Sequence, residues 1–261
     1  MQIELDGKVA LIVGAAQGIG FATATEMRAS GAKVAVADIN GDAAMAAAER
    51  LNGDATETLG VRVDISSLES VEAMVSEVTK TLGAPDIVVV SAALLDDKTF
   101  LDSGPKDWRR IIDVCLYGPL NVLHTVLPGM TERGYGRIIC MASDSARVGQ
   151  ARLSYYAAAK GGVIALIKSV AQEVGPEGVT LNVVSPGATD TELRQAREAQ
   201  TKEAIGDERY ASRTKKVLRM YPARRIGLPQ DHASMITYLA SDHASWITGQ
   251  VISVNGGFVM P

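Results

Sequence analysis

The stretch that decides the fold is Lys8-Val-Ala-Leu-Ile-Val-Gly14-Ala-Ala-Gln-Gly18-Ile-Gly20, near the start of the chain. Its first six residues form the short apolar run that is typical of a strand buried on both faces. The glycines follow at Gly-x-x-x-Gly-x-Gly spacing, and the helical pattern of residues 21–30 stops at Gly31. A strand, a glycine turn and a helix in this order predict a dinucleotide site, because glycines let the backbone approach a pyrophosphate and the helix N-terminus offers free N–H groups.

The same alternation of strands and helices continues along the chain. We expect helices between the strands, most clearly at 67–82, 107–130 and 154–174, the first of them opened by a capping box at residues 66–69. Such alternation predicts an α/β fold, a single-domain doubly wound (Rossmann) parallel sheet of about seven strands with helices on both faces, spanning residues 1–261. The expected strands are 8–13, 33–38, 58–63, 86–91, 136–142, 179–184 and 250–254.

A second informative stretch is Tyr156-Ala-Ala-Ala-Lys160, whose spacing places both side chains on one face of a helix. A charge about 4 Å away is worth roughly 4 kcal/mol at an effective dielectric near 20, and about 1 kcal/mol in water. The ammonium could therefore lower a phenol pKa from about 10 towards 7, but only in a dry cleft. Tyr155 is a rival base, although it is out of step with Lys160. Taken alone, the pattern also describes a surface lysine beside a half-buried tyrosine.

Together with the glycine turn and with Ser143, thirteen residues before Tyr156, this pattern resembles the short-chain dehydrogenase/reductase family over residues 6–257 or so. Residues 182–187 with Thr191 resemble the nicotinamide loop of that family, and residues 248–257 resemble its last strand. The resemblance implies a hydride transfer between a nicotinamide cofactor and a secondary alcohol or ketone. It also implies that Tyr156 exchanges the proton, Ser143 orients the substrate oxygen, and Lys160 lowers the Tyr156 pKa and binds the nicotinamide ribose.

The cofactor expected from these residues is NAD. Asp38 ends the second predicted strand, where a carboxylate accepts hydrogen bonds from ribose hydroxyls and repels a 2′-phosphate, and no arginine stands beside it. Asp38 and Asp64 could instead cap the helices that follow them. The resemblance implies cofactor contacts from Gly14, Gln17, Gly18, Ile19, Gly20, Asp38, Asp64, Ile65, Ser91, Ala92, Ala93, Tyr156, Lys160, Pro186, Gly187, Thr189 and Thr191.

The sequence departs from the family pattern in two places. The usual Asn-Asn-Ala-Gly after the fourth strand is Val90-Ser-Ala-Ala93, where the extra methyl of Ala93 should leave cofactor binding intact. Cys115 stands where members of the family usually have an asparagine that holds a water linked to the lysine. A thiol is a poor hydrogen-bond partner, so the proton relay is interrupted or runs through other groups. In the second case an asparagine restored there would be a buried amide without a partner.

The substrate is less well defined. Residues 190–226 or so show no strand pattern and resemble a substrate lid, and 194–225 hold ten Lys or Arg against four Asp or Glu. This bias could attract an anionic substrate, a carboxylate or a coenzyme A thioester, or it could be a solvated helix face. Arg147 and Arg152 lie nearer the predicted chemistry, and residues 142–162 are similar to members that oxidise alicyclic compounds or 3-hydroxyacyl thioesters.

Composition is consistent with this assignment. The chain has 261 residues, a net charge of −4 and two cysteines, Cys115 and Cys140, with no pairing or metal-ligand pattern. We therefore expect no metal, no nucleic-acid partner and a cytoplasmic location, and the absence of a long apolar run or leader argues against a membrane. Helices 107–130 and 154–174 are apolar over more than one face, which predicts a homotetramer, with a dimer as the alternative. The alternative to an enzyme is a non-catalytic partner subunit of a hetero-oligomeric dehydrogenase.

Overall fold

The computed structural model describes residues 3–51 and 57–260. In this part of the chain seven parallel strands form one sheet in the order β3-β2-β1-β4-β5-β6-β7. This confirms the α/β prediction, and every predicted strand is found within two residues of its expected ends. The strands are β1 (Val9–Val13), β2 (Lys33–Asp38), β3 (Thr58–Arg62), β4 (Ile87–Val90), β5 (Gly136–Met141), β6 (Val179–Pro186) and β7 (Val251–Val254).

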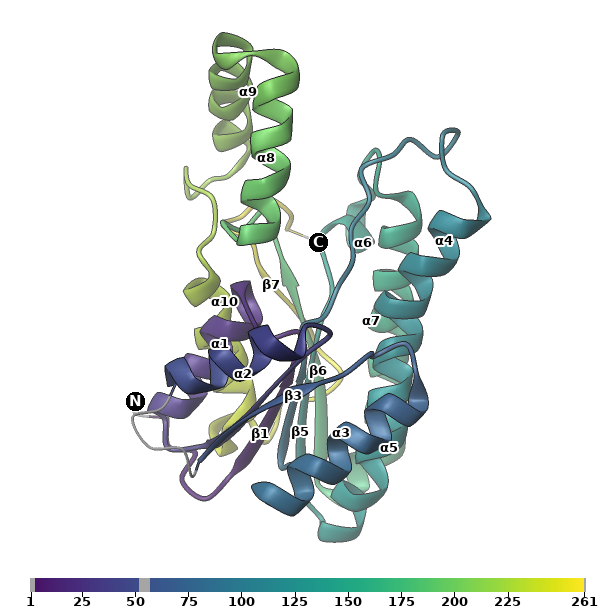
Figure 1. The fold of residues 1–261 in the computed structure, drawn as a ribbon, viewed down its shortest axis with the longest axis vertical. Coiled ribbons are helices and arrows are strands. Elements are labelled where there is room, and N and C mark those ends of the chain that lie inside the picture. Colours follow the sequence, from purple (N-terminus) through teal and green to yellow (C-terminus); the bar gives the residue numbers. More distant parts are fainter. Residues whose placement is uncertain (1–2, 52–56, 261) are drawn as a thin grey trace.

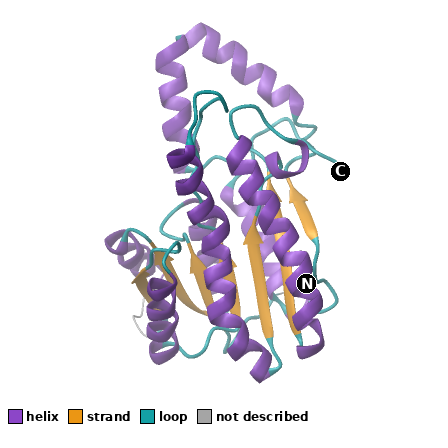
Figure 2. Cartoon of the chain, turned by 90° about the vertical axis from the view of Figure 1, so that its right-hand side faces the viewer, coloured by secondary structure: helices purple, strands orange, loops and turns teal. Residues whose placement is uncertain are grey.

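The strand order reverses beside β1, which pairs with β2 on one side and with β4 on the other. In an open α/β sheet, a ligand binds beyond the carboxyl ends of the strands at such a reversal. The glycine turn follows β1 and the Ser91 segment follows β4, so both reach this crevice. Figure 2 shows the strands pointing to the end of the molecule from which α8 and α9 project.

Alternate residues of the buried strands feed two cores, one on each face of the sheet. Leu11 and Val13 of β1 belong to the core that is covered by α3 (Leu68–Thr81), α5 (Gly118–Arg133) and α7 (Ser154–Val174). Ala10 and Ile12 belong to the core that is covered by α1 (Gly18–Ala29), α2 (Gly41–Leu51) and α10 (Pro229–Ala240). Figure 1 shows these two groups of helices on opposite sides of the sheet. The period-two alternation therefore explains why strands without polar faces are stable here.

The segment expected to be a lid forms two helices, α8 (Glu192–Ile205) and α9 (Asp207–Met220), joined at Gly206. We call residues 192–220 the α8–α9 hairpin. It contains no buried residue and stands out from the end of the sheet at which the strands terminate (Figure 1). Its side chains are therefore available to the cleft below it and to solvent.

The predicted helix 107–130 is part of a longer helical stretch that changes its winding. It consists of α4 (Pro105–Ile112), a π-helical turn η1 (Asp113–Tyr117) and α5, and Cys115 lies in the π-helical turn. Among the described residues, Pro105–Arg133 is the one helical stretch that is long and apolar enough to cross a membrane, judged by length and composition alone. The core helix of a globular protein meets the same criteria, and Val122, Val126 and Met130 pack in the sheet core.

The remaining short helices are α6 (Ser145–Val148), η2 (Gly175–Glu177) and η3 (Asp242–Ala244). The capping box predicted at residues 66–69 is wrong in its register. Ser67 is the N-cap of α3, and its hydroxyl accepts a hydrogen bond from the N–H of Ser70 at 3.2 Å. Glu69 accepts a hydrogen bond from the Ser67 hydroxyl and does not reach the backbone of the cap.

Candidate functional site

A pocket of about 460 Å³ lies at the carboxyl ends of the strands and collects most of the predicted site. Its walls come from segments that are far apart in the chain: the glycine turn, the ends of β2 and β4, helix α7 and the start of α8. Of the residues predicted to contact the cofactor, the pocket is lined by Gly14, Gln17, Gly18, Ile19, Asp38, Asp64, Ile65, Ser91, Ala92, Ala93, Tyr156, Lys160, Pro186 and Thr191.

The glycine turn is built for close approach. Gly14 has a φ of +80°, and a Cβ there would lie 2.4 Å from the backbone nitrogen of Ala92. Gly18 has a φ of +60° and begins α1, whose N-cap, Gln17, makes no side-chain hydrogen bond to the helix. No acidic residue lies in the first turn of α1. The N–H groups and the partial positive charge of this helix end therefore lie at the pocket, which is an arrangement that fits a pyrophosphate, and the Glu192 carboxylate also approaches Gly18.

Asp38 lines the same pocket at the end of β2. One of its carboxylate oxygens accepts a hydrogen bond from the N–H of Ala16 at 3.2 Å, and the other accepts one from the N–H of Asn40 at 3.2 Å. Each oxygen keeps a further acceptor position for a hydroxyl group. The capping alternative does not describe Asp38, because it is the side chain of Asn40 that accepts from the N–H of Ala43 in the first turn of α2.

Asp64 and Ile65 line the pocket at the end of the β3 segment. The Asp64 carboxylate accepts hydrogen bonds from the N–H and the hydroxyl of Ser66, at 3.0 and 2.6 Å. It thus stabilises the local turn, while Ser67 caps α3. The backbone of Ile65 is fixed by α5, because the Ile65 carbonyl accepts a hydrogen bond from the Asn121 amide at 3.0 Å.

Three predicted cofactor residues do not line the pocket: Gly20, Gly187 and Thr189. A Cβ at Gly20 would lie 2.2 Å from the Gly14 carbonyl oxygen, so this glycine allows the helix to pack on its own turn. A Cβ at Gly187 would lie 3.0 Å from Asn255. The Thr189 hydroxyl lies 2.7 Å from Nε2 of the buried His232. These positions support the pocket from behind.

Tyr156 and Lys160 lie on the cleft face of α7, and Ser143 follows β5. Lys160 is 1% exposed, and its Nζ donates a hydrogen bond to the Met141 carbonyl at 2.8 Å. The ammonium lies 6.0 Å from the centre of the Tyr156 ring. Ser143 Oγ accepts hydrogen bonds from the N–H and the hydroxyl of Ser145, at 3.2 and 2.9 Å, and its own proton is directed to the Tyr156 oxygen.

The pKa of Tyr156 depends on the groups that surround its phenol. Burial raises this pKa above its ordinary value, and the Cys115 thiol raises it further, while a hydrogen bond with Ser143 and the charge of Arg197 lower it. Lys160 is not among the groups that act on this pKa here, and its lowering effect in a cleft kept dry by a bound cofactor stays a prediction. Without that effect the phenol is protonated at neutral pH.

The neighbouring Tyr155 lies on a different face of α7. It is buried, and its hydroxyl donates a hydrogen bond to the Asp96 carboxylate at 3.2 Å. Burial, followed by the negative charge of Asp96, raises the pKa of Tyr155 to about 12. Tyr155 does not line the pocket, so the structure supports Tyr156 over its neighbour as the residue that meets a substrate.

Cys115 takes the place expected for asparagine and has two backbone partners. Its Sγ accepts a hydrogen bond from the N–H of Leu94 and donates one to the carbonyl of Leu94, each at 3.4 Å. Leu94 itself lines the pocket. The prediction that a buried amide at position 115 would have no partner is therefore wrong, because an amide can also donate and accept at once. Cys115 is fully buried.

No sequence motif indicated the hydrogen-bond network behind Ser143. The next residue, Asp144, is buried, and its carboxylate accepts hydrogen bonds from the Ser185 hydroxyl at 2.9 Å and the Asn255 amide at 2.7 Å. Burial raises the pKa of Asp144, and the two hydrogen bonds oppose that rise. These contacts tie the end of β5 to β6 and to the loop after β7, and so fix the backbone that carries Ser143.

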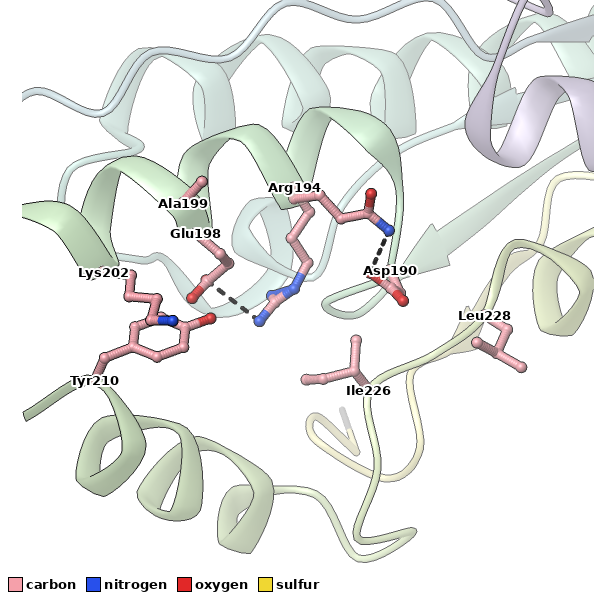
Figure 3. A pocket seen from close by; sticks show the side chains of 9 residues that line it. Asp190, Arg194, Glu198, Ala199, Lys202, Tyr210, Ile226 and Leu228 are labelled. Atoms are coloured by element: carbon pink, nitrogen blue, oxygen red, sulfur yellow. Dashed lines mark hydrogen bonds and ion pairs between the residues drawn. The ribbon is translucent and has the colours of Figure 1, made fainter. Parts of the chain in front are cut away.

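A second pocket, of about 440 Å³, lies between the α8–α9 hairpin and residues 226–228. Figure 3 shows the ion pair of Arg194 with Glu198 and, separately, the Asp190 carboxylate that accepts a hydrogen bond from the neutral Gln195 amide. Lys202 pairs with Asp207 outside the pocket lining. Among residues 3–51 and 57–260, no group of three or more His, Cys, Asp or Glu could hold a metal ion.

Comparison with known proteins agrees with this arrangement. A family model described as enoyl-(acyl carrier protein) reductase matches residues 14–259. An uncharacterized short-chain type dehydrogenase/reductase of Sinorhizobium fredii is 36% identical over 98% of this chain and 99% of its own. The 3-oxoacyl-(acyl-carrier-protein) reductase FabG is 35% identical in Vibrio cholerae and 32% identical in Escherichia coli, over 99% of this chain and 100% of the relative in each case.

These matches extend over the glycine turn, the sheet and the segment that carries Ser143, Tyr156 and Lys160. They cover nearly the full length of both partners. The chain belongs to the short-chain dehydrogenase/reductase family and is an oxidoreductase that uses a nicotinamide nucleotide.

Proposed function

We propose that this protein transfers a hydride between NAD and a secondary alcohol or ketone. The observation that carries the proposal is that one pocket contains both the glycine turn with Asp38 and the pair Tyr156 and Lys160. The first pair suits a dinucleotide, and the second pair suits a proton transfer at the far end of the same pocket. The nicotinamide supplies the hydride acceptor or donor when it is bound.

The roles of the chain's own residues follow from their contacts. Tyr156 holds its proton at neutral pH and is therefore ready to donate it to a ketone oxygen during reduction. In the oxidative direction it must take up a proton from the alcohol, which requires its phenolate form. The Ser143 hydroxyl, which is hydrogen-bonded to Tyr156, can donate its proton to the same substrate oxygen when a substrate is bound. Lys160, anchored on the Met141 carbonyl, places a positive charge under the site.

The choice of NAD over NADP rests on Asp38. Its carboxylate lines the pocket at the end of β2, where it would repel a 2′-phosphate and accept hydrogen bonds from ribose hydroxyls. Its register neighbour on β3 is Arg62, which does not line the pocket. With a carboxylate inside the pocket, binding of a further dianionic group is unfavourable.

The substrate class is supported by two of the relatives. Each is named for the reduction of a 3-oxoacyl group, and this reaction converts a ketone into a secondary alcohol. The residue types in the pocket of the present chain are suited to the same conversion in either direction.

A direct test uses the purified chain with NAD and a panel of secondary alcohols, and with NADH and the matching ketones, followed by the absorbance of the reduced cofactor. We expect turnover in both directions, which Ser143→Ala lowers by about 10²-fold or more. A wild-type protein that binds NADH but turns over none of the panel would instead favour a non-catalytic subunit.

A further inference from the structure

Two arginines from separate segments converge on one carboxylate beside the cleft. Arg152, in the turn before α7, donates from Nε to the Asp97 carboxylate and from its terminal nitrogen to the Asp97 carbonyl at 2.7 Å. Arg197, on α8, donates to the other carboxylate oxygen at 2.8 Å. Asp97 and Arg197 are 100 positions apart in the sequence, so the three residues come together only in the folded chain. We call them the Asp97 cluster.

The members of the cluster do not line the cofactor pocket themselves, but they follow closely in the chain on segments that do. The chain passes from Ser91–Leu94, which line the cofactor pocket, directly to Asp97. The intervening Asp96 accepts hydrogen bonds from Tyr155, the neighbour of Tyr156, and from Arg110 of α4. From the other side, Arg197 projects from the helix whose first residues, Thr191–Leu193, also line the pocket. The charge of Arg197 acts on the Tyr156 phenol and lowers its pKa.

The charges of the cluster do not balance. Two guanidinium groups share one carboxylate, which leaves a net charge of +1 from the three side chains. By contrast, Glu198 on the same helix pairs with Arg194 and Arg213 at the α9 side, away from Asp97. All three members of the Asp97 cluster are partly solvent-exposed, with side-chain exposures between 36% and 53%. A second anion can therefore reach the two arginines.

The backbone of Arg152 is also strained. Its φ is +70°, a left-handed conformation that costs roughly 1–2 kcal/mol in a residue with a Cβ. The two hydrogen bonds to Asp97 hold the side chain in place despite this cost. Strain of this kind persists where the surrounding contacts fix a side chain for a purpose, and it is concentrated at ligand-binding sites.

We propose that Arg152 and Arg197 recognise a free carboxylate on the substrate, and that Asp97 occupies their forks until the substrate arrives. The substrate is then a hydroxy acid or oxo acid rather than a neutral alcohol or an acyl thioester. Arginine suits this task because its planar fork binds a carboxylate through two parallel hydrogen bonds. The inference rests on the proposed function, since it assigns the substrate class of the same site.

The test compares substrates that differ only in the anionic group. We choose 3-hydroxybutanoate and 4-hydroxycyclohexanecarboxylate, each as the free acid and as the methyl ester, together with the N-acetylcysteamine thioester of the first. We expect kcat/KM to be at least about 10-fold higher for the acids, as loss of a charge-assisted hydrogen bond implies. Equal or better turnover of the esters or the thioester by the wild-type protein would overturn the inference and leave the proposed function in place.

Variants show whether the preference comes from the cluster. Arg197→Gln should lower kcat/KM for the acids by about 10- to 100-fold more than for the esters, mainly through KM, because any effect of the lost charge on Tyr156 acts on both kinds of substrate. Arg213→Gln is the matched control, because it removes a lid arginine that pairs with Glu198 instead. It should keep the preference for acids. An unchanged preference in Arg197→Gln, or equal losses in both variants, would reject the role of the cluster.

A binding measurement separates this inference from the proposed function. Butanoate and methyl butanoate are titrated calorimetrically into the wild-type protein and Arg197→Gln, each saturated with NADH. Butanoate should bind the wild type at least about 10-fold more tightly than the ester, and this difference should vanish in the variant. If this holds while no alcohol is turned over, the proposed function fails and the carboxylate site stands. If butanoate binds no better than the ester, the inference is wrong.

Discussion

At the scale of single residues, the most consequential one is Tyr156. Its phenol lines the cofactor pocket, and burial keeps its pKa above the ordinary value. The proposed reaction therefore favours reduction at neutral pH, since the proton is already on the donor. Oxidation should accelerate as pH rises, because only the phenolate form of Tyr156 can accept the proton from an alcohol.

Removing this hydroxyl gives the first prediction. Tyr156→Phe should lower kcat by about 10³-fold or more and leave NADH affinity within a few-fold, because the proton donor is lost while the pocket keeps its shape. Tyr155→Phe is the neighbouring control, since that hydroxyl donates to Asp96 instead. Steady-state kinetics and fluorescence titration with NADH measure the two effects. The assignment is wrong if Tyr155→Phe inactivates the protein and Tyr156→Phe does not.

Asp38 gives the second prediction. Asp38→Ala should reduce the preference for NAD over NADP, because it removes the charge that repels the 2′-phosphate. The hydrogen bond from Ala16 is lost at the same time, so NAD binding should weaken as well. Ratios of kcat/KM for the two cofactors, measured for the wild type and the variant, check this result. A wild-type protein that uses NADPH better than NADH would contradict the role given to Asp38.

Cys115 gives the third prediction. An asparagine there can donate to the Leu94 carbonyl and accept from the Leu94 N–H, as the thiol does, so Cys115→Asn should change the free energy of unfolding by less than about 1.5 kcal/mol. Cys115→Ala leaves both groups unpaired and should destabilise the protein by about 1–3 kcal/mol. Urea unfolding of both variants decides the matter. Equal losses for the two substitutions would show that the contacts to Leu94 contribute nothing.

At the scale of elements, helix α10 packs behind the loop of residues 187–191, which follows β6. Its buried His232 lies 2.7 Å from the Thr189 hydroxyl, which donates its own proton to the Gly187 carbonyl at 3.1 Å. The hydroxyl must therefore accept from His232 Nε2–H, so the neutral ring carries its proton on Nε2. Nδ1 then has no hydrogen-bond partner among the described residues. Burial lowers the pKa of His232 to about 4.

This arrangement gives the fourth prediction. An unfolded histidine titrates near 6.5, so between pH 6.5 and 4 the unfolded chain binds the proton and the folded chain does not. The stabilisation that comes from the neutral His232 ring is fully present above pH 6.5. Below that pH it decreases by about 1.4 kcal/mol for each pH unit. Between pH 6.5 and 5, the free energy of unfolding of His232→Gln should therefore fall by about 2 kcal/mol less than that of the wild type, as measured by urea unfolding. His124→Gln, at an exposed position of α5, is the control.

At the scale of the whole molecule, the helices on the α5 and α7 side expose apolar surface. Tyr117 is 54% exposed and Leu120 is 37% exposed, although both belong to the helical stretch that covers the sheet. On α7 the two adjacent glycines differ. A Cβ at Gly162 would lie 2.9 Å from Leu116 of the same chain, whereas a Cβ at Gly161 would meet nothing within 4 Å. Gly161 is therefore open to a second copy.

The fifth prediction concerns assembly. We expect a homotetramer, with a dimer as the alternative, formed through the exposed faces of α5 and α7. Gly161→Glu should shift the protein to a smaller species, because it places a charge on the predicted interface without a clash inside the chain. Ala46→Glu, at an exposed position of α2, is the control and should leave the mass unchanged. Light scattering at micromolar concentration measures both. A monomeric wild type, or equal masses for all three proteins, would contradict the prediction.

How much the sequence determined depends on the range of the interactions. The seven strands, the glycine turn and helix α7 were all predictable, because apolar periodicity and glycine spacing act over a few neighbouring residues. The same patterns placed Tyr156 and Lys160 on one helical face, and the parallel order of strands brought Gly14 and Asp38 to one edge. Family membership followed from these local motifs in combination.

Only the tertiary structure decided what surrounds those residues. Lys160 is directed to the Met141 carbonyl, Cys115 binds Leu94, and Asp97 joins Arg152 to Arg197. The partners in these contacts are 19 to 100 positions apart, so no local pattern records them. Burial also raises the Tyr156 pKa, an effect that the spacing does not record. Desolvation depends on everything that packs around a group, and a linear sequence does not specify that packing position by position.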